Sequence, residues 1–143
     1  MNEMKSTISW VNDSMFVGEA GSGHSVVIDG PPDAGGRNAG IRPMELVLTG
    51  IGACTSYDVV SILRKSRQAV TDCRAELVAE RADSIPQVFT RIHIHFVVTG
   101  KDLKTSAVER AVNLSAEKYC SATLMLKGSV EITHDVEIIE QSP

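Results

Sequence analysis

The sequence has no excess of basic residues, and this absence excludes one broad class of function. Its 143 residues carry 14 Lys and Arg against 18 Asp and Glu, for a formal net charge of −4 at pH 7. The densest basic stretch is Arg64, Lys65 and Arg67, which we interpret as the end of a helix, where cations offset the helix dipole. Surfaces that bind nucleic acid or anionic lipid need a basic footprint. We therefore expect neither nucleic acid nor a membrane as a partner.

Motifs of several common enzyme sites are also missing. The chain has no Gly-x-Ser-x-Gly, no Walker lysine motif, no dinucleotide fingerprint and no Cys-x-x-Cys. The glycine-rich segment 18–23 is not followed by a helix with Lys and Ser or Thr, so it predicts a β-turn rather than a phosphate cradle. We therefore expect no cofactor.

The chain shows no sign of export or membrane insertion. Residues 1–7 contain no apolar run, so we expect no secretory signal and a cytoplasmic location. The longest apolar segment, 46–63, carries Asp58 near its middle, which indicates a buried helix of a soluble protein rather than a lipid-spanning one. In a reducing cytoplasm, cysteine pairs are more often catalytic or redox-active than structural. The three cysteines are therefore candidates for chemistry.

Length and patterning predict one domain, residues 1–143, of the α+β class. Short β-rich runs fill the first 30 residues, and the Gly- and Pro-rich segment 30–42 predicts a long loop, a feature often functional in compact domains. The periodic elements that follow are a helix at about 43–67, strands at 73–80 and 89–98, a helix from 105 toward 120, and a strand at 129–139.

The first predicted helix is apolar nearly all round. Leu46, Val47, Leu48 and Ile51 occupy different sides of it, which is typical of a helix buried from every direction. One small sheet can cover only one of those sides. We therefore predict a homodimer in which a second copy of the helix covers the other.

Cys54 and Cys120 are the residues best suited to carry chemistry. One reactive thiol can be oxidised by a peroxide, and a second thiol allows recovery through a disulfide. A free cysteine has a pKa of about 8.5, so its thiol is mostly protonated at neutral pH, and a nearby guanidinium is the simplest way to favour the thiolate. Arg37 and Arg42, in the loop before the first helix, are the natural candidates, and Arg91 is a third.

Other polar residues have simpler interpretations beside functional ones. On position alone, Cys54 could be a small buried hydrophobic residue. Asp58, four residues later on the same helical face, is expected to have a structural role. Glu45 lies in the first helical turn, where the dipole favours a carboxylate, and its sharper role would be to hold an Arg in place.

The histidines and the third cysteine complete the candidates. Two His at positions i and i+2 of a strand can bind zinc, but no ligand spacing supports this for His93 and His95, so we expect a solvent-exposed face. Cys73 begins a strand and has no partner in sequence, so we interpret it as a packing residue.

Two segments together resemble the OsmC/Ohr family of thiol peroxidases. They are RPMELVLTGIGAC at 42–54 and VERAVNLSAEKYC at 108–120, in the family's order and roughly its spacing. The motifs PMEL and ACTSYDVVSIL are most similar to the YhfA-like branch. The resemblance implies an intertwined homodimer, with two long helices packed against antiparallel sheets and active sites at the subunit interface.

The resemblance also implies a mechanism. Cys54 attacks an organic hydroperoxide or hydrogen peroxide, Cys120 condenses with the resulting sulfenic acid, and an external dithiol reduces the disulfide. An Arg, matched by Arg42 or Arg37, stabilises the thiolate, and a Glu orients it. In the Ohr branch that Glu directly follows the Pro, where this chain has Met44, and the carboxylate is at Glu45 instead.

Two rival functions remain open at this point. The first is a binding or redox-sensing protein of the same fold whose thiols react slowly, and the Met44 and Glu45 departure is its distinguishing feature. The second is a structural metal-binding dimer that uses His93 and His95 and retains zinc on purification.

Overall fold

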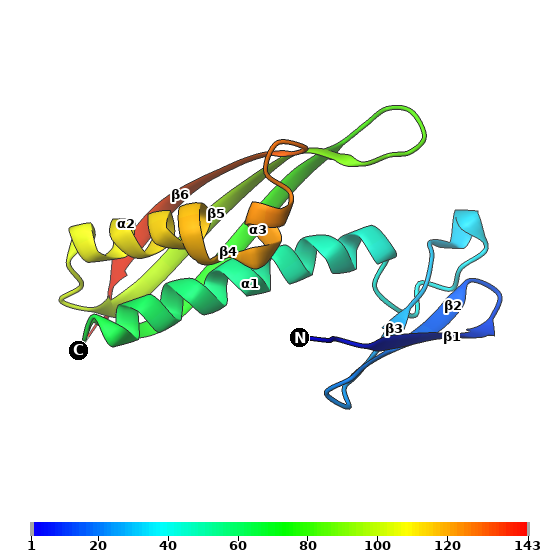
Figure 1. Cartoon of the computed structure of the whole chain (residues 1–143), viewed down its shortest axis with the longest axis horizontal. Coiled ribbons are helices and arrows are strands. Elements are labelled where there is room, and N and C mark those ends of the chain that lie inside the picture. The colour runs from blue at the N-terminus through cyan, green and yellow to red at the C-terminus, as the bar shows by residue number, and fades with distance from the viewer. Residues whose placement is uncertain (1, 143) are drawn as a thin grey trace. The chain divides into compact units, whose positions relative to one another are not determined.

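Three short antiparallel strands form the first of two compact units. The computed structural model describes residues 2–142, and the first unit extends to Val47. Its strands are β1 (Ser6–Asn12), β2 (Met15–Ala20) and β3 (Ser25–Ile28), in the order β1-β2-β3 (Figure 1). The glycine-rich segment is the turn between β2 and β3, as predicted, and Gly23 adopts a φ of 91° that suits glycine. The Gly- and Pro-rich segment 30–42, which follows β3, contains a 3₁₀ turn, Pro32–Ala34.

The first unit has almost no core of its own. Among residues 2–47, only Gly18 and Asp29 are buried. Large apolar side chains of β1 lie open, with Ile8 59% and Trp10 68% exposed. A sheet stabilised by apolar burial needs a cover for such a face. These side chains therefore lack packing partners within the first unit.

The second unit, from Leu48 onward, contains a three-stranded sheet covered on one face by helices. Its strands are β4 (Ala69–Arg81), β5 (Phe89–Lys101) and β6 (Glu131–Glu140), in the order β4-β5-β6. Helix α1 (Pro43–Lys65) begins in the first unit and continues into the second. The other helical elements are α2 (Thr105–Leu114), a π-helical turn (Ser115–Tyr119) and α3 (Ser121–Met125). Figure 1 shows α1 and α2 on the same side of this sheet. The α+β class is confirmed.

Alternation along β5 separates the core from the outer face of the sheet. Ile92, Ile94 and Phe96 are buried at 0–3% exposure, whereas His93 and His95 point to the other side. This buried face is the one that the helices cover in Figure 1. Fully burying each such side chain contributes about 1.5–3 kcal/mol, so this strand is the centre of the core.

Two details of the second unit differ from expectation. The sheet is mixed rather than antiparallel, because β6 pairs with β5 in parallel while β4 pairs with it antiparallel. The second helix does not run on to Cys120. It ends at Leu114, the π-helical turn follows, and Cys120 has an extended conformation with φ −73° and ψ 103°. The π turn is closed by a 2.8 Å bond from the Cys120 N–H to the Ser115 carbonyl.

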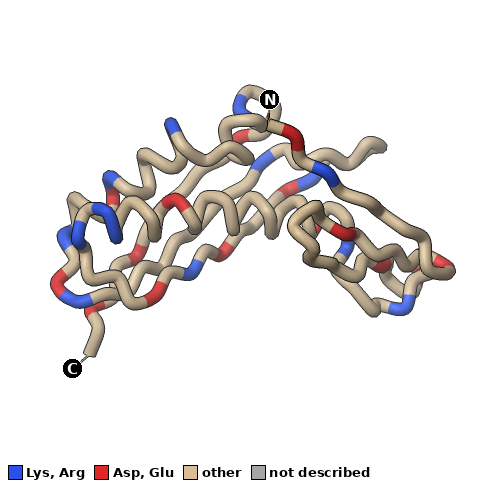
Figure 2. Tube along the Cα trace, turned by 60° about the horizontal axis from the view of Figure 1, so that its bottom comes forward, with Lys and Arg blue, Asp and Glu red and all other residues tan. Residues whose placement is uncertain are grey.

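Helix α1 is apolar well beyond the face that the sheet covers. Its buried residues within the second unit follow one stripe: Ile51, Gly52, Thr55, Val59 and Leu63. Among the described residues it is the one helix long and apolar enough to cross a membrane by length and composition, with mean hydropathy 1.6 and 28% of that window buried. Figure 2 shows Lys and Arg interspersed with Asp and Glu along the trace. The single chain leaves much of α1 uncovered.

Candidate functional site

The structure brings together the two cysteines that the sequence singled out. The Sγ atoms of Cys54 and Cys120 and a carboxylate oxygen of Asp58 all lie within 4.8 Å of one another. Cys54 and Asp58 are one helical turn apart on α1, and Cys120 follows the π-helical turn. All three cysteines of the chain are free thiols. The two sulfurs are therefore near enough for small side-chain movements to form a bond of about 2.05 Å.

The break after the π-helical turn determines how Cys120 is held. Cys120 is the N-cap residue of α3, and its Sγ accepts hydrogen bonds from the Thr123 N–H at 3.4 Å and the Thr123 hydroxyl at 3.1 Å. Cys120 itself is fully buried. Sequence reasoning missed both this cap and Thr123, although a Cys-x-x-Thr spacing resembles an N-cap with a polar residue at the third helical position.

Burial is the main influence on the Cys120 thiol. It raises the pKa of Cys120 above its ordinary value. The two hydrogen bonds from Thr123 act in the opposite direction, and the neighbouring Cys54 raises the pKa again. Cys120 is consequently a protonated thiol at neutral pH, with an orientation fixed by Thr123.

A small network of hydroxyl groups links the two segments that carry the cysteine pair. The buried hydroxyls of Thr55 and Ser115 share a 2.7 Å hydrogen bond that joins α1 to the π-helical turn. Ser115 Oγ also lies 3.3 Å from Asp58 Oδ2, to which it can donate. Asp58 is therefore hydrogen-bonded within the cluster, and its expected structural role stays a prediction. Ser115 was not predicted, although it stands seven residues after Val108 and so interrupts the apolar stripe of that helix with a polar residue.

The predicted thiolate activators belong to the first unit, where each has local partners. Arg37 forms a 2.8 Å ion pair with Asp13. The guanidinium of Arg42 donates to the side-chain oxygen of Asn38, and the Arg42 backbone N–H donates to Glu45 Oε1 at 2.9 Å. Glu45 therefore satisfies a backbone donor at the start of α1 rather than a guanidinium within this unit. The proposed roles of the three residues stay predictions.

Asp29, which the sequence did not single out, organises the loop that carries both arginines. It is 2% exposed, and its carboxylate accepts the backbone N–H groups of Gly30, Arg37 and Ala39 at 2.8–3.1 Å. These hydrogen bonds, led by that from Ala39, lower the pKa of Asp29. The buried negative charge thus fixes the path of the loop.

The third candidate cation, Arg91, is not brought to Cys54. Arg91 lies on the outer face of β5, away from the helices, and forms a 2.9 Å ion pair with Glu131. The outer-face prediction for His93 and His95 is confirmed. The parallel pairing of β6 adds a carboxylate that the sequence did not reveal, because Asp135 Oδ1 lies 2.9 Å from a ring nitrogen of each histidine.

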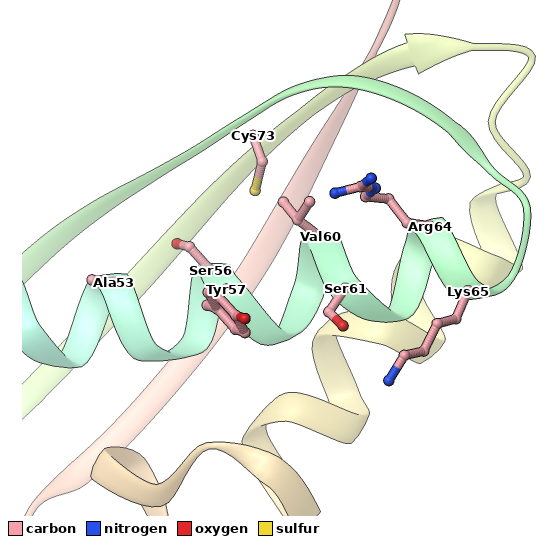
Figure 3. A pocket seen from close by; sticks show the side chains of 8 residues that line it. All are labelled: Ala53, Ser56, Tyr57, Val60, Ser61, Arg64, Lys65 and Cys73. Carbon is pink, nitrogen blue, oxygen red and sulfur yellow. The ribbon is translucent and has the colours of Figure 1, made fainter.

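Cys73 lines a cavity rather than filling the core. Its sulfur points from β4 toward α1 in Figure 3, where the cavity of about 740 Å³ is also lined by Ser56, Val60 and Arg64. Burial, aided by the negative charge of Asp72, raises the pKa of Cys73. Cys73 is therefore a poor nucleophile and lies outside the Cys54 cluster.

Comparison with known proteins agrees with this architecture. The family model described as OsmC-like protein matches residues 35–135. Protein YhfA of Escherichia coli (strain K12) is 49% identical over 139 residues, covering 95% of this chain and 98% of YhfA. A hypothetical protein from Aquifex aeolicus VF5 has a crystal structure that is 30% identical with a TM-score of 0.87, covering 99% of this chain and 100% of that one.

A more distant likeness concerns the fold. The crystal structure of the organic hydroperoxide resistance protein OhrB of Bacillus subtilis is 19% identical with a TM-score of 0.63, and the match covers 95% of this chain and 98% of OhrB. The match of the family model to most of the chain and the 49% identity to YhfA are the decisive findings. The chain therefore belongs to the OsmC/Ohr family, in the branch that contains YhfA.

Proposed function

We propose that the protein is a cofactor-free thiol peroxidase that reduces organic hydroperoxides, with hydrogen peroxide as an alternative substrate. The observation that carries the proposal is the approach of the Cys54 and Cys120 sulfurs to within 4.8 Å from elements distant in sequence. A lone reactive cysteine would need an external thiol to recover from oxidation. A neighbouring thiol makes recovery intramolecular and therefore fast.

The reaction divides into three balanced steps. The Cys54 thiolate attacks the terminal oxygen of the hydroperoxide, so that an S–O bond forms and the O–O bond breaks, and the departing alkoxide takes up from solvent the proton that the thiol had released. The sulfur of Cys120 then attacks the Cys54 sulfenic acid, forming the disulfide and releasing water. An external dithiol, small or protein-borne, reduces the disulfide to two thiols and is itself oxidised. A cytoplasmic location would provide such reductants.

The different environments of the two thiols support this assignment of roles. Cys54 is half-buried on α1, whereas Cys120 is fully buried and has a raised pKa. Attack on a peroxide needs an accessible thiolate, which favours Cys54. A resolving thiol only has to reach the sulfenic acid beside it, so burial is no obstacle for Cys120.

The proposal includes a homodimer. The exposed apolar side chains of β1 and the uncovered side of α1 both need a partner surface, and a second copy of the chain can supply it. Within such a dimer, Arg42 or Arg37 would stabilise the Cys54 thiolate, and Glu45 would hold the guanidinium. Sedimentation velocity should give a dimer at micromolar concentration, and a stable monomer would contradict this part of the proposal.

One set of observations favours a second candidate, a slowly reacting redox sensor of the same fold. The carboxylate of Asp58 lies beside both sulfurs, and a negative charge opposes thiolate formation. Glu45 is engaged by the Arg42 backbone rather than by a guanidinium in its own unit. Either feature would slow the first step without preventing the disulfide.

The decisive experiment measures dithiol-dependent consumption of cumene hydroperoxide. Turnover should disappear in Cys54→Ser. In Cys120→Ser, one equivalent of peroxide should still be consumed while the disulfide no longer forms. Cys73→Ser is the matched control and should retain full activity. Undiminished turnover in Cys54→Ser would refute the peroxidase assignment. If the wild-type thiols react with peroxide only as fast as free cysteine does, the redox sensor is favoured.

A further inference from the structure

The cluster of Cys54, Asp58 and Cys120 contains more than a disulfide requires. A disulfide needs only the two thiols, yet a carboxylate oxygen lies within 4.8 Å of both sulfurs. Tetrahedral zinc binds thiolates at about 2.3 Å and carboxylates at about 2.0–2.2 Å, which separates neighbouring ligand atoms by roughly 3.5–3.8 Å. Side-chain movements that shift these atoms by about 1 Å would therefore bring all three to coordination distance.

We infer that the reduced protein binds one Zn²⁺ ion through the sulfurs of Cys54 and Cys120 and the carboxylate of Asp58. Binding displaces the two thiol protons to solvent, and no other bond is made or broken. Two sulfurs and one oxygen form a donor set that suits zinc better than Mg²⁺ or Ca²⁺, which prefer oxygen ligands. The inference stands on the geometry and does not rest on the proposed peroxidase activity.

The surroundings of Asp58 agree with a ligand. Ser115 Oγ, 3.3 Å from Asp58 Oδ2, can hold the carboxylate in position, as partners of ligating carboxylates usually do. Within residues 48–142, which the structure describes, no Lys or Arg forms an ion pair with Asp58. In the complex, a divalent cation would offset two of the three negative charges carried by Asp58 and the two thiolates.

A cavity borders the cluster on the side of Asp58. Asp58 also lines a cavity of about 290 Å³ between α1 and the π-helical turn, together with Leu114 and Tyr119. Three protein ligands and one open position are typical of zinc that exchanges its fourth ligand. Water would occupy that position in the resting protein.

Zinc and the disulfide exclude each other at this site. Formation of the S–S bond consumes both sulfur ligands, so oxidation would release the ion, and bound zinc would shield both thiols from peroxide. Zinc availability would thus set the fraction of protein able to react.

The test titrates zinc and cobalt into the reduced, metal-free, full-length protein in competition with a chromophoric chelator. We expect one equivalent of metal, with thiolate-to-cobalt charge-transfer absorption in the near ultraviolet. Cys54→Ser and Cys120→Ser should abolish that absorption, and Asp58→Asn should weaken binding at least about 10-fold. Cys73→Ser is the matched cysteine control and should bind normally.

The histidine face provides the second control. His93 and His95 could bind metal by nitrogen alone, so the double variant His93→Ala/His95→Ala should keep the stoichiometry and the absorption. Cobalt binding without charge-transfer absorption, or loss of binding in the histidine variant alone, would overturn the inference. Wild-type protein alone gives an independent measurement, because zinc should slow alkylation of Cys54 and Cys120 but not of Cys73. Absent protection would also overturn it, while peroxide turnover without metal would leave the proposed function intact.

Discussion

The hydroxyl oxygens of Thr55 and Ser115 lie 2.7 Å apart and are both buried, which joins the middle of α1 to the first residue of the π-helical turn. Thr55 directly follows Cys54, and Ser115 begins the turn that ends at Cys120. Together with the contacts of Ser115 Oγ to the Thr55 carbonyl and to Asp58, this hydrogen bond links the two backbone segments that carry the sulfurs.

Replacing Ser115 with alanine should separate those segments. The change leaves the buried Thr55 hydroxyl without this partner and removes a donor to Asp58, so we expect a loss of about 1–3 kcal/mol in the free energy of unfolding. Disulfide formation should also slow, because the hydrogen bonds that hold the two cysteine-bearing segments together are lost. Urea denaturation and peroxide-driven thiol loss measure the two effects. Ser106→Ala, at an exposed position of α2, is the control and should change neither.

Two glycines of α1 should respond to alanine in opposite ways. A Cβ on Gly52 would lie 2.7 Å from Leu77 Cδ1, so the helix must move away from β4 or Leu77 must shift, at a cost of about 1–2 kcal/mol. A Cβ on Gly50 meets nothing within 4 Å, and Gly50→Ala should stabilise the helix by about 0.5–1 kcal/mol. Thermal or urea unfolding of both variants checks the prediction, and equal effects would contradict it.

Removing the Thr123 hydroxyl should make Cys120 still harder to ionise. Burial already raises the pKa of Cys120, and the hydrogen bonds from Thr123 oppose that rise. In Thr123→Val one of the two bonds disappears, so the pKa should move further up and alkylation at a given pH should slow. The rate profile against pH in a Cys54→Ser/Cys73→Ser background reports this shift. Thr123→Ser, which retains a hydroxyl, should restore the original profile.

The histidine face should contribute stability only in mildly acidic solution. The hydrogen bond with Asp135 raises the pKa of His95, and the same contact lowers the pKa of Asp135. The His95 contribution is therefore complete below its ordinary value of 6.5 and is lost as pH rises through the raised pKa. The Asp135 contribution is present above its ordinary value of 3.8 and is lost as pH falls through the lowered pKa.

Nuclear magnetic resonance titration of the His95 ring tests this interaction directly. In Asp135→Asn, the midpoint should fall, and the extra stability between about pH 4 and 6.5 should disappear. Glu131→Gln, which removes the neighbouring exposed ion pair with Arg91, should leave the His95 titration unchanged. An unaltered midpoint in Asp135→Asn would show that the contact does not form in solution.

Local patterns were sufficient to predict the strands and the first helix. Alternation of Ile92, His93 and Ile94 specifies both the strand and its buried face, because one side must meet the helices. Pro43 marks the first residue of α1, where its missing N–H costs nothing. The cysteine pair could likewise be recognised, since each thiol stands in a segment with a helical sequence pattern, although Cys120 itself is extended in the structure.

Features that depend on register or on an inserted residue were beyond such patterns. The π-helical turn changes the helix repeat at Ser115 and so reorients Cys120, while the amino acids there suit an ordinary helix equally well. Asp135 meets His93 only because β6 runs parallel to β5. The long connection between the two strands determines this direction, and no local pattern encodes it. The buried role of Asp29 depends on three backbone groups that no side-chain pattern identifies.

The parallel pairing of β6 with the central strand also has a consequence for synthesis on the ribosome. Because α2, the π-helical turn and α3 all precede β6, the sheet cannot be completed until β6 itself has emerged from the exit tunnel. Until then β5 presents one unpaired edge, next to side chains as apolar as Phe96. A nascent chain stalled before β6 should therefore be prone to aggregate rather than fold, because this edge of β5 stays unpaired.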